Sequence, residues 1–260
     1  MLSNISVDQA LTKARSHVKK HETIEAQKLY QAVLLAFPKN IRAQQGLAAL
    51  NVTNQTNSPP KETINHLVKL YNEGQLKAAF NKAQALTEQY PYKFILWNIL
   101  GTSAVQLKML DKAIEAFKKC ISLKPDNADT YIKIGVALKR QGKFEDALKA
   151  YKVCISLKPD YFVAYNNMGN VLKEIGDYVK AVKMFKKAVL IKPDYAEAYN
   201  NLGNTLQNQG ELEEAIETYN KCILLKPNNF VAFNNLGNAF KELKKLGKAI
   251  KMFKKAISIK

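Results

Sequence analysis

Residues 194–227 read DYAEAYNNLGNTLQNQGELEEAIETYNKCILLKP, and this 34-residue stretch returns in altered form throughout Phe94–Lys260. Each copy carries an aromatic residue with a glycine four positions later, then an alanine with a second aromatic residue four positions later. The prolines that separate the copies lie 34 residues apart, at Pro91, Pro125, Pro159, Pro193 and Pro227. One supersecondary unit is therefore written five times, as in a repeat architecture.

The apolar spacing inside each copy predicts two helices. Large apolar residues three and four positions apart fall on one face of a helix. A glycine such as Gly210 between the halves suits the left-handed residue that ends many helices, and each proline stops the second helix. Because one helix pair cannot bury its apolar face alone, the copies must stack on one another.

This pattern resembles the tetratricopeptide repeat, whose period and signature positions it matches across the five copies. The resemblance implies an all-α solenoid, a right-handed superhelix of antiparallel helix pairs whose first helices line a concave surface.

The domain organisation follows from where the pattern weakens. Residues 1–50 predict a degenerate copy plus one extra helix over Ile41–Leu50. The polar run NVTNQTNSPP at 51–60 predicts a linker. Residues 61–260 predict a solenoid of six tandem repeats, the first of them weak.

Bulk properties indicate a protein of the cytoplasm. Apolar residues make up 47% of the 260 residues, which is enough for a continuous core. The start lacks a basic segment followed by an apolar run, and no stretch is long enough to span a membrane, so we expect neither a signal peptide nor membrane insertion. Cys120, Cys154 and Cys222 occupy a slot that alanine fills in sister copies, so we expect buried free thiols.

We find no sequence feature that predicts catalysis. Glycine-rich phosphate loops, nucleophile elbows and CxxC pairs are absent, and the glycines sit at packing and turn positions. His17 and His21 lie four residues apart but lack a third ligand. We therefore expect no enzyme activity, no cofactor and no metal.

The strongest functional signal is a block of nine asparagines in the first helices of three late copies. Asparagine is a middling helix former that prefers caps and turns, so this placement calls for a reason. The positions are Asn166, Asn167, Asn170, Asn200, Asn201, Asn204, Asn234, Asn235 and Asn238. The run NNLGN resembles the repeats of O-linked N-acetylglucosamine transferases and bacterial relatives, which implies that Asn167, Asn201 and Asn235 form a ladder binding the backbone of an extended partner.

A carboxamide can pair with any peptide group because it offers both donor and acceptor, so such a groove would tolerate many sequences. The alternative is that the asparagines bond one another and only stabilise the stack.

The groove changes character towards the N-terminus, where Lys133 stands at the position of Asn167 and Lys139 and Arg140 follow it in the same copy. Basic residues on this surface clamp a carboxylate in chaperone-binding members of the family, but the full order of that clamp is not present here. The clamp therefore stays an alternative interpretation of these three residues.

The net charge of +18 invites a nucleic-acid interpretation. Most lysines follow the repeat register of an exposed face, arginine is rare, and the aromatic residues fall on core positions that leave bases no stacking platform. The sequence therefore does not favour nucleic acid as the partner.

The sequence predicts a protein-interaction scaffold that binds an unidentified peptide or protein in its groove. One alternative is the substrate-recruiting arm of a longer group-transfer enzyme. Another is a self-assembling scaffold, a homo-oligomer formed through an edge around Phe253 and Ile257, because no polar capping helix follows them.

Overall fold

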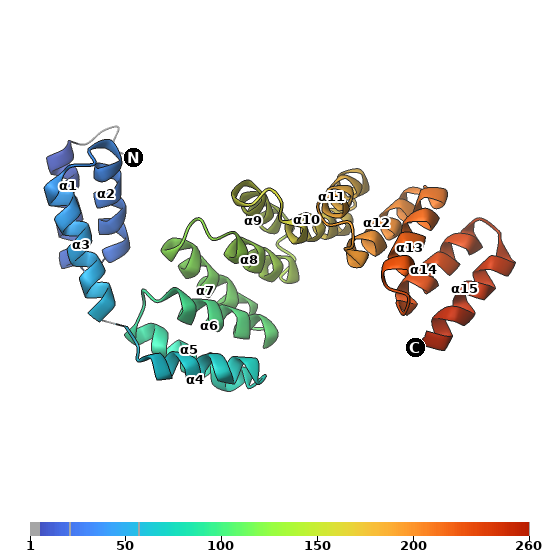
Figure 1. The fold of residues 1–260 in the computed structure, drawn as a ribbon, viewed down its shortest axis with the longest axis horizontal. Coiled ribbons are helices and arrows are strands. Elements are labelled where there is room, and N and C mark those ends of the chain that lie inside the picture. Colours follow the sequence, from blue (N-terminus) through green and yellow to red (C-terminus); the bar gives the residue numbers. More distant parts are fainter. Residues whose placement is uncertain (1–5, 21, 57, 260) are drawn as a thin grey trace. The chain divides into compact units, whose positions relative to one another are not determined.

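The computed structural model describes residues 6–20, 22–56 and 58–259, and every regular element in these residues is an α-helix. The chain forms two compact units, residues up to Pro125 and residues from Asp126. Apart from the single helix Ile41–Thr56, the helices within each unit come in antiparallel pairs joined by short turns (Figure 1). The predicted all-α repeat fold is confirmed.

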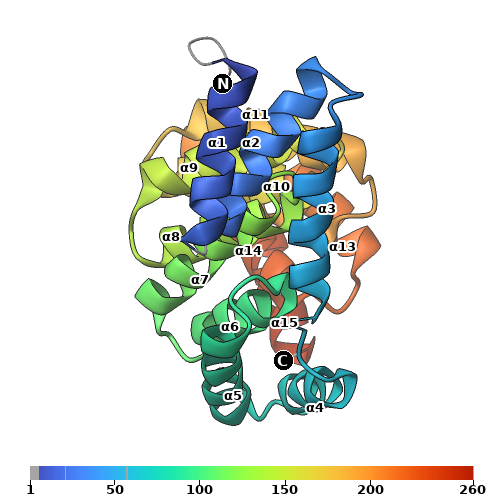
Figure 2. The same ribbon diagram turned by 90° about the vertical axis from the view of Figure 1, so that its left-hand side faces the viewer.

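The first unit contains seven helices among its described residues. They are α1 (Val7–Lys19), α2 (Thr23–Ala36), α3 (Ile41–Thr56), α4 (Lys61–Asn72), α5 (Leu76–Gln89), α6 (Phe94–Gln106) and α7 (Leu110–Leu123). Helices α1, α2 and α3 lie side by side in Figures 1 and 2 and share a core around Tyr30 and Leu11. Helices α4 to α7 pack in order along the chain.

Helix α3 corrects one boundary. It continues to Thr56, so residues 51–56 of the predicted linker are helical, and only 58–60 of its described residues are not. Asparagine, threonine and glutamine are tolerated in a helix, and Pro59 is the first residue that cannot continue it. The wider division into an N-terminal module and six tandem repeats stays a prediction, and the compact units divide elsewhere, after Pro125.

The second unit contains eight helices among its described residues. They are α8 (Ala128–Arg140), α9 (Phe144–Leu157), α10 (Phe162–Glu174), α11 (Tyr178–Ile191), α12 (Ala196–Gln209), α13 (Leu212–Leu225), α14 (Phe230–Glu242) and α15 (Leu246–Ile259). Helix α10 contacts both α8 and α12, and α12 contacts α14. The first helices of successive repeats therefore form one contiguous surface.

A close approach of glycine to an aromatic ring fixes the two helices of each repeat from α6–α7 to α14–α15. A Cβ on Gly203 would lie 2.6 Å from Cε1 of Tyr219, and one on Gly135 would lie 2.5 Å from Cε1 of Tyr151. Real Cβ atoms do not approach carbon so closely, which explains why glycine and a ring recur together. The turn glycine Gly210 has φ of 84°, the left-handed conformation expected there.

The three cysteines are buried and free, as expected from their slot. Their thiols pack in the second helices α7, α9 and α13.

Candidate peptide-binding surface

The nine asparagines form three rows across α10, α12 and α14. We call them the first row (Asn166, Asn200, Asn234), the second row (Asn167, Asn201, Asn235) and the third row (Asn170, Asn204, Asn238). Members of one row occupy equivalent positions in successive repeats, so each row runs across the stacked helices.

Two residues of the first row, Asn166 and Asn200, tie neighbouring repeats together. Asn166 is completely buried, and its Nδ2 donates to Glu197 Oε1 at 3.2 Å and to Tyr195 Oη at 3.3 Å. Its Oδ1 accepts from Asn201 Nδ2 at 3.0 Å. Because its donors and its acceptor are all engaged, Asn166 serves the stack. Burial, with Glu197 beside it, raises the pKa of Tyr195 to about 12, so this phenol stays protonated.

The second row is only partly engaged by the stack. Asn201 Nδ2 bonds to Asn166, and Asn235 Nδ2 donates to Asn200 Oδ1 at 3.1 Å. Among the described residues, the carbonyl oxygens of Asn201 and Asn235 accept no side-chain hydrogen bond, and Asn167 makes none at all. The interpretation that the asparagines bond one another therefore holds for one donor each of Asn201 and Asn235. Binding of a partner by the remaining groups of this row stays a prediction.

In the third row, one asparagine differs from its sisters. Asn204 Oδ1 accepts from Tyr219 Oη at 2.7 Å, and the same hydroxyl lies 2.9 Å from Gln207 Oε1. Gln207 Nε2 in turn donates to Glu242 of α14. At the position of Tyr219 the neighbouring repeats carry phenylalanine, so Asn170 and Asn238 lack this bond.

Helix α8 carries the predicted basic residues Lys133, Lys139 and Arg140. Lys139 Nζ forms an ion pair with Glu174 Oε1 at 2.7 Å. Burial, together with the charge of Lys139, lowers the pKa of Lys173 on α10. With Glu174 neutralising Lys139, this part of the surface is less cationic than the sequence suggests, and its carboxylate-binding role stays a prediction.

Beneath α8, Tyr151 Oη is buried without a hydrogen-bond partner in the part of the chain that the structure describes. Its ring packs on Gly135 as Tyr219 packs on Gly203, but Val136 stands where Asn204 would be. Burial, with a smaller contribution from Glu174, raises the pKa of Tyr151 well above its usual range.

Sequence reasoning missed Tyr219, Gln207, Tyr195 and Glu197. The repeat pattern identifies Tyr219 only as one of the recurring aromatic residues. A signal was present: the ring position alternates between tyrosine and phenylalanine while the facing position changes from valine to asparagine. Reading these two positions together would have identified the Tyr219–Asn204 pair.

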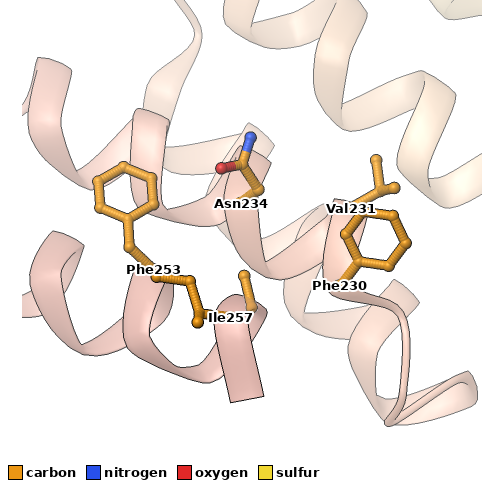
Figure 3. A pocket seen from close by; sticks show the side chains of 6 residues that line it. Phe230, Val231, Asn234, Phe253 and Ile257 are labelled. Carbon is orange, nitrogen blue, oxygen red and sulfur yellow. The ribbon is translucent and has the colours of Figure 1, made fainter. Parts of the chain in front are cut away.

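The predicted association edge lies at the last two described helices. Phe253 and Ile257 line a pocket of ≈ 540 Å³ with Phe230, Val231 and Asn234 (Figure 3). Ile257 is 76% exposed. The two residues predicted together are thus neighbours in one apolar pocket, while association through it stays a prediction.

Other kinds of site find no support in the described ranges. No group of three histidine, cysteine or acidic side chains there could hold a metal ion. His17 Nδ1 contacts Glu22 Oε2 at 2.5 Å, and His21 lies outside the described residues. No described helix has both the length and the apolar character to cross a membrane.

Comparison with known proteins defines the class of this chain. A tetratricopeptide repeat model matches residues 196–229 and 230–260, and a second model of the repeat matches 102–142, 137–176 and 169–210. The chain therefore belongs to the tetratricopeptide repeat family, a class of helical-repeat scaffolds for protein interactions. No curated protein sequence matches it significantly.

Solved structures agree with this class. MamA is 30% identical with a TM-score of 0.58, over 62% of this chain and 94% of MamA. YrrB, described as a TPR protein with an unusual peptide-binding site, is 21% identical with a TM-score of 0.55, over 68% of this chain and 92% of YrrB. Cut9 with Hcn1, an APC/C hetero-tetramer, is 17% identical with a TM-score of 0.64, over 91% of this chain and 49% of that one. The last two show the fold alone.

Proposed function

We propose that the surface of α10, α12 and α14 binds an extended segment of a partner protein through its peptide backbone. The observation that carries this proposal is the second asparagine row. Asn201 and Asn235 retain a carbonyl oxygen and one N–H after tying the repeats, and Asn167 retains its whole carboxamide.

The spacing of the row suits an extended chain. Helices in contact lie about 8–10 Å apart, and an extended chain advances about 3.3–3.6 Å per residue. Successive second-row asparagines then meet about every third peptide group. The peptide-binding site of YrrB, a protein of the same fold, supports the proposal that such a scaffold holds a peptide.

Backbone recognition makes a specific prediction for the ligand. Asparagine side chains on peptide groups read no side chain, so many sequences should bind with similar affinity. Replacing a ligand side chain with alanine should change little, whereas methylating a contacted backbone nitrogen should abolish one hydrogen bond.

The experiment begins with peptides of about twelve residues, selected from a phage-displayed library on the native chain. Their dissociation constants are then compared for the native chain and the triple variant Asn167→Ala, Asn201→Ala, Asn235→Ala. A matched control replaces the exposed Asn208, Asn220 and Asn228 with alanine. Circular dichroism first establishes that both variants fold.

We expect the second-row variant to bind at least about tenfold more weakly, which corresponds to losing about 1.4 kcal/mol, while the control binds normally. Equal binding by all three proteins would show that the row only stabilises the stack.

A second candidate function, association with a second copy, is favoured by the apolar pocket in Figure 3. In sister repeats the corresponding groove is covered by the first helix of the following repeat, which brings Asn201 to Asn166 and Asn235 to Asn200. The pocket on α14 and α15 continues this series of interfaces.

The lysines of α15 set the salt dependence of such an association. Two copies meeting at this edge would bring like charges together, so salt should strengthen the dimer by screening them. Sedimentation at several concentrations tests this: Ile257→Lys should leave a monomer, whereas Leu224→Lys, at an 81% exposed position elsewhere, should not. A native chain that stays monomeric at every salt concentration would contradict it.

A further inference from the structure

The α12–α13 repeat contains a network of side-chain hydrogen bonds around Tyr219 that its neighbours lack. Tyr219 is fully buried with its ring against Gly203, so its hydroxyl cannot move away from α12. That hydroxyl donates to Asn204 Oδ1 at 2.7 Å and lies 2.9 Å from Gln207 Oε1. The bond of Gln207 to Glu242 holds the second acceptor in place.

This bond decides which way the Asn204 carboxamide points. Its oxygen is turned to Tyr219, so its two N–H donors are turned away from that hydroxyl, and no described residue accepts from them. Three residues earlier on the same helix, Asn201 is oriented the other way. One of its N–H groups donates to Asn166, and its carbonyl oxygen accepts no hydrogen bond from a described side chain. Positions three apart lie on one face of a helix.

We propose that Tyr219 is a positioning residue that sets the hydrogen-bonding polarity of this surface. Through it, Asn204 offers donors to carbonyl oxygens of a bound extended peptide, while Asn201 offers an acceptor to a peptide N–H. The inference rests on the proposed function of the surface. According to this inference, the α12–α13 repeat binds both the N–H groups and the carbonyl oxygens of a peptide backbone.

The other repeats of the second unit explain why this one is distinct. Phe185 and Phe253 place the same ring against glycine but have no hydroxyl to orient Asn170 or Asn238. Tyr151 has the hydroxyl, but Val136 stands at the position that corresponds to Asn204. These substitutions supply natural controls, since the fold accepts both phenylalanine and tyrosine at this position.

Two single variants separate orientation from donation. Tyr219→Phe keeps the ring and frees the Asn204 carboxamide to turn. Asn204→Asp keeps an acceptor for Tyr219 but cannot donate, because an ionised carboxylate only accepts. With a selected peptide as probe, we expect Tyr219→Phe to raise Kd about fivefold, the equivalent of about 1 kcal/mol, and Asn204→Asp to raise it at least about tenfold.

A readout on the ligand distinguishes positioning from general weakening. Replacing one peptide group with an ester removes its N–H and weakens its carbonyl acceptor, so the ester whose effect depends on Tyr219 locates the carbonyl that Asn204 contacts. The ester that weakens binding to the native chain should have a much smaller effect on Tyr219→Phe. Adding Phe185→Tyr to that variant should restore part of the affinity by orienting Asn170, which loss of stability could not produce.

The possible results distinguish three claims: the positioning role of Tyr219, the donor role of Asn204 and peptide binding by the surface. If Tyr219→Phe binds like the native chain while Asn204→Asp does not, Tyr219 has no positioning role and peptide binding by the surface stands. Native affinity in Asn204→Asp overturns the assigned donor polarity. Failure of the proposed function itself shows elsewhere, as unchanged binding in the second-row triple variant.

Discussion

The α8–α9 and α12–α13 repeats share one apolar frame and differ in how they satisfy one hydroxyl. In both, a ring lies against a glycine at nearly the same distance, 2.5 Å to a Cβ on Gly135 and 2.6 Å to one on Gly203. Yet Tyr219 Oη donates to Asn204 Oδ1 and lies 2.9 Å from Gln207 Oε1, while Tyr151 Oη has no partner among the described residues. The packing of ring on glycine is thus determined by the positions that recur in every copy. The polar contacts of each repeat are determined by a few first-helix residues that lie between those positions.

The largest effect should show what the two repeats share. Gly135→Ala and Gly203→Ala should each destabilise the chain by about 1–3 kcal/mol, because the added Cβ overlaps a buried ring. Gly247→Ala is the control, since a Cβ there meets nothing within 4 Å, and it should stabilise α15 by up to about 1 kcal/mol. Urea unfolding measures all three. Unequal losses at Gly135 and Gly203 would show that the frames differ.

The next effect should separate the repeats. Tyr219→Phe should reduce the free energy of unfolding by about 1 kcal/mol, the usual contribution of one hydrogen bond. Tyr151→Phe should increase it by about 1 kcal/mol, because it removes a buried hydroxyl that lacks a partner among the described residues. Both variants keep the ring, so packing cancels in the comparison. Equal signs in the two unfolding measurements would mean that Tyr151 Oη finds an acceptor in solution.

These pairs mark how far sequence reasoning could reach. The period, the helix pairs and the buried cysteines followed from apolar spacing, because one repeat's packing is copied in the next. The end of α3 did not follow, since residues 51–56 are polar but tolerated in a helix. The sequence also did not predict which asparagine groups bond between repeats and which have no partner among the described residues. This depends on which side-chain amide lies within hydrogen-bond distance of Asn166 in the neighbouring repeat. The packing of the repeats on one another determines that distance.

A third experiment would convert one repeat towards the other. Val136→Asn places a carboxamide opposite Tyr151, as Asn204 lies opposite Tyr219. Val136 is half-buried, so the replacement alone gives up some apolar burial. The informative quantity is the coupling between Val136→Asn and Tyr151→Phe in a double-mutant cycle, expected at about 0.5–1.5 kcal/mol. A coupling near zero would show that α8 holds the new side chain out of reach of the hydroxyl.

The smallest effect concerns the thiols, which occupy the same slot in both repeats. Burial, with Asp129 nearby, raises the pKa of Cys154 to about 11. Burial also raises the pKa of Cys222, but Asn229 Nδ2 donates to its Sγ at 3.4 Å and partly opposes the shift. Tyr161 stands at the position of Asn229 in the other repeat and donates instead to Asp129.

A raised pKa means that the folded chain favours the protonated thiol. The contribution of each thiol to the free energy of unfolding is therefore fully present below the pKa of an unfolded cysteine, and it is lost as the pH rises through the pKa in the folded chain. At about pH 8 both thiols should therefore react with iodoacetamide more slowly than an exposed cysteine, whose pKa is about 8.5. Asn229→Asp keeps an N-cap acceptor for Ala232 but removes the donor to Cys222, so it should raise the pKa of that thiol and slow its labelling further. Labelling of Cys154 in the same digest is the internal reference and should not change. Faster labelling of Cys222 alone would mean that the bond from Asn229 keeps the repeat closed and does not act on the charge of the sulfur.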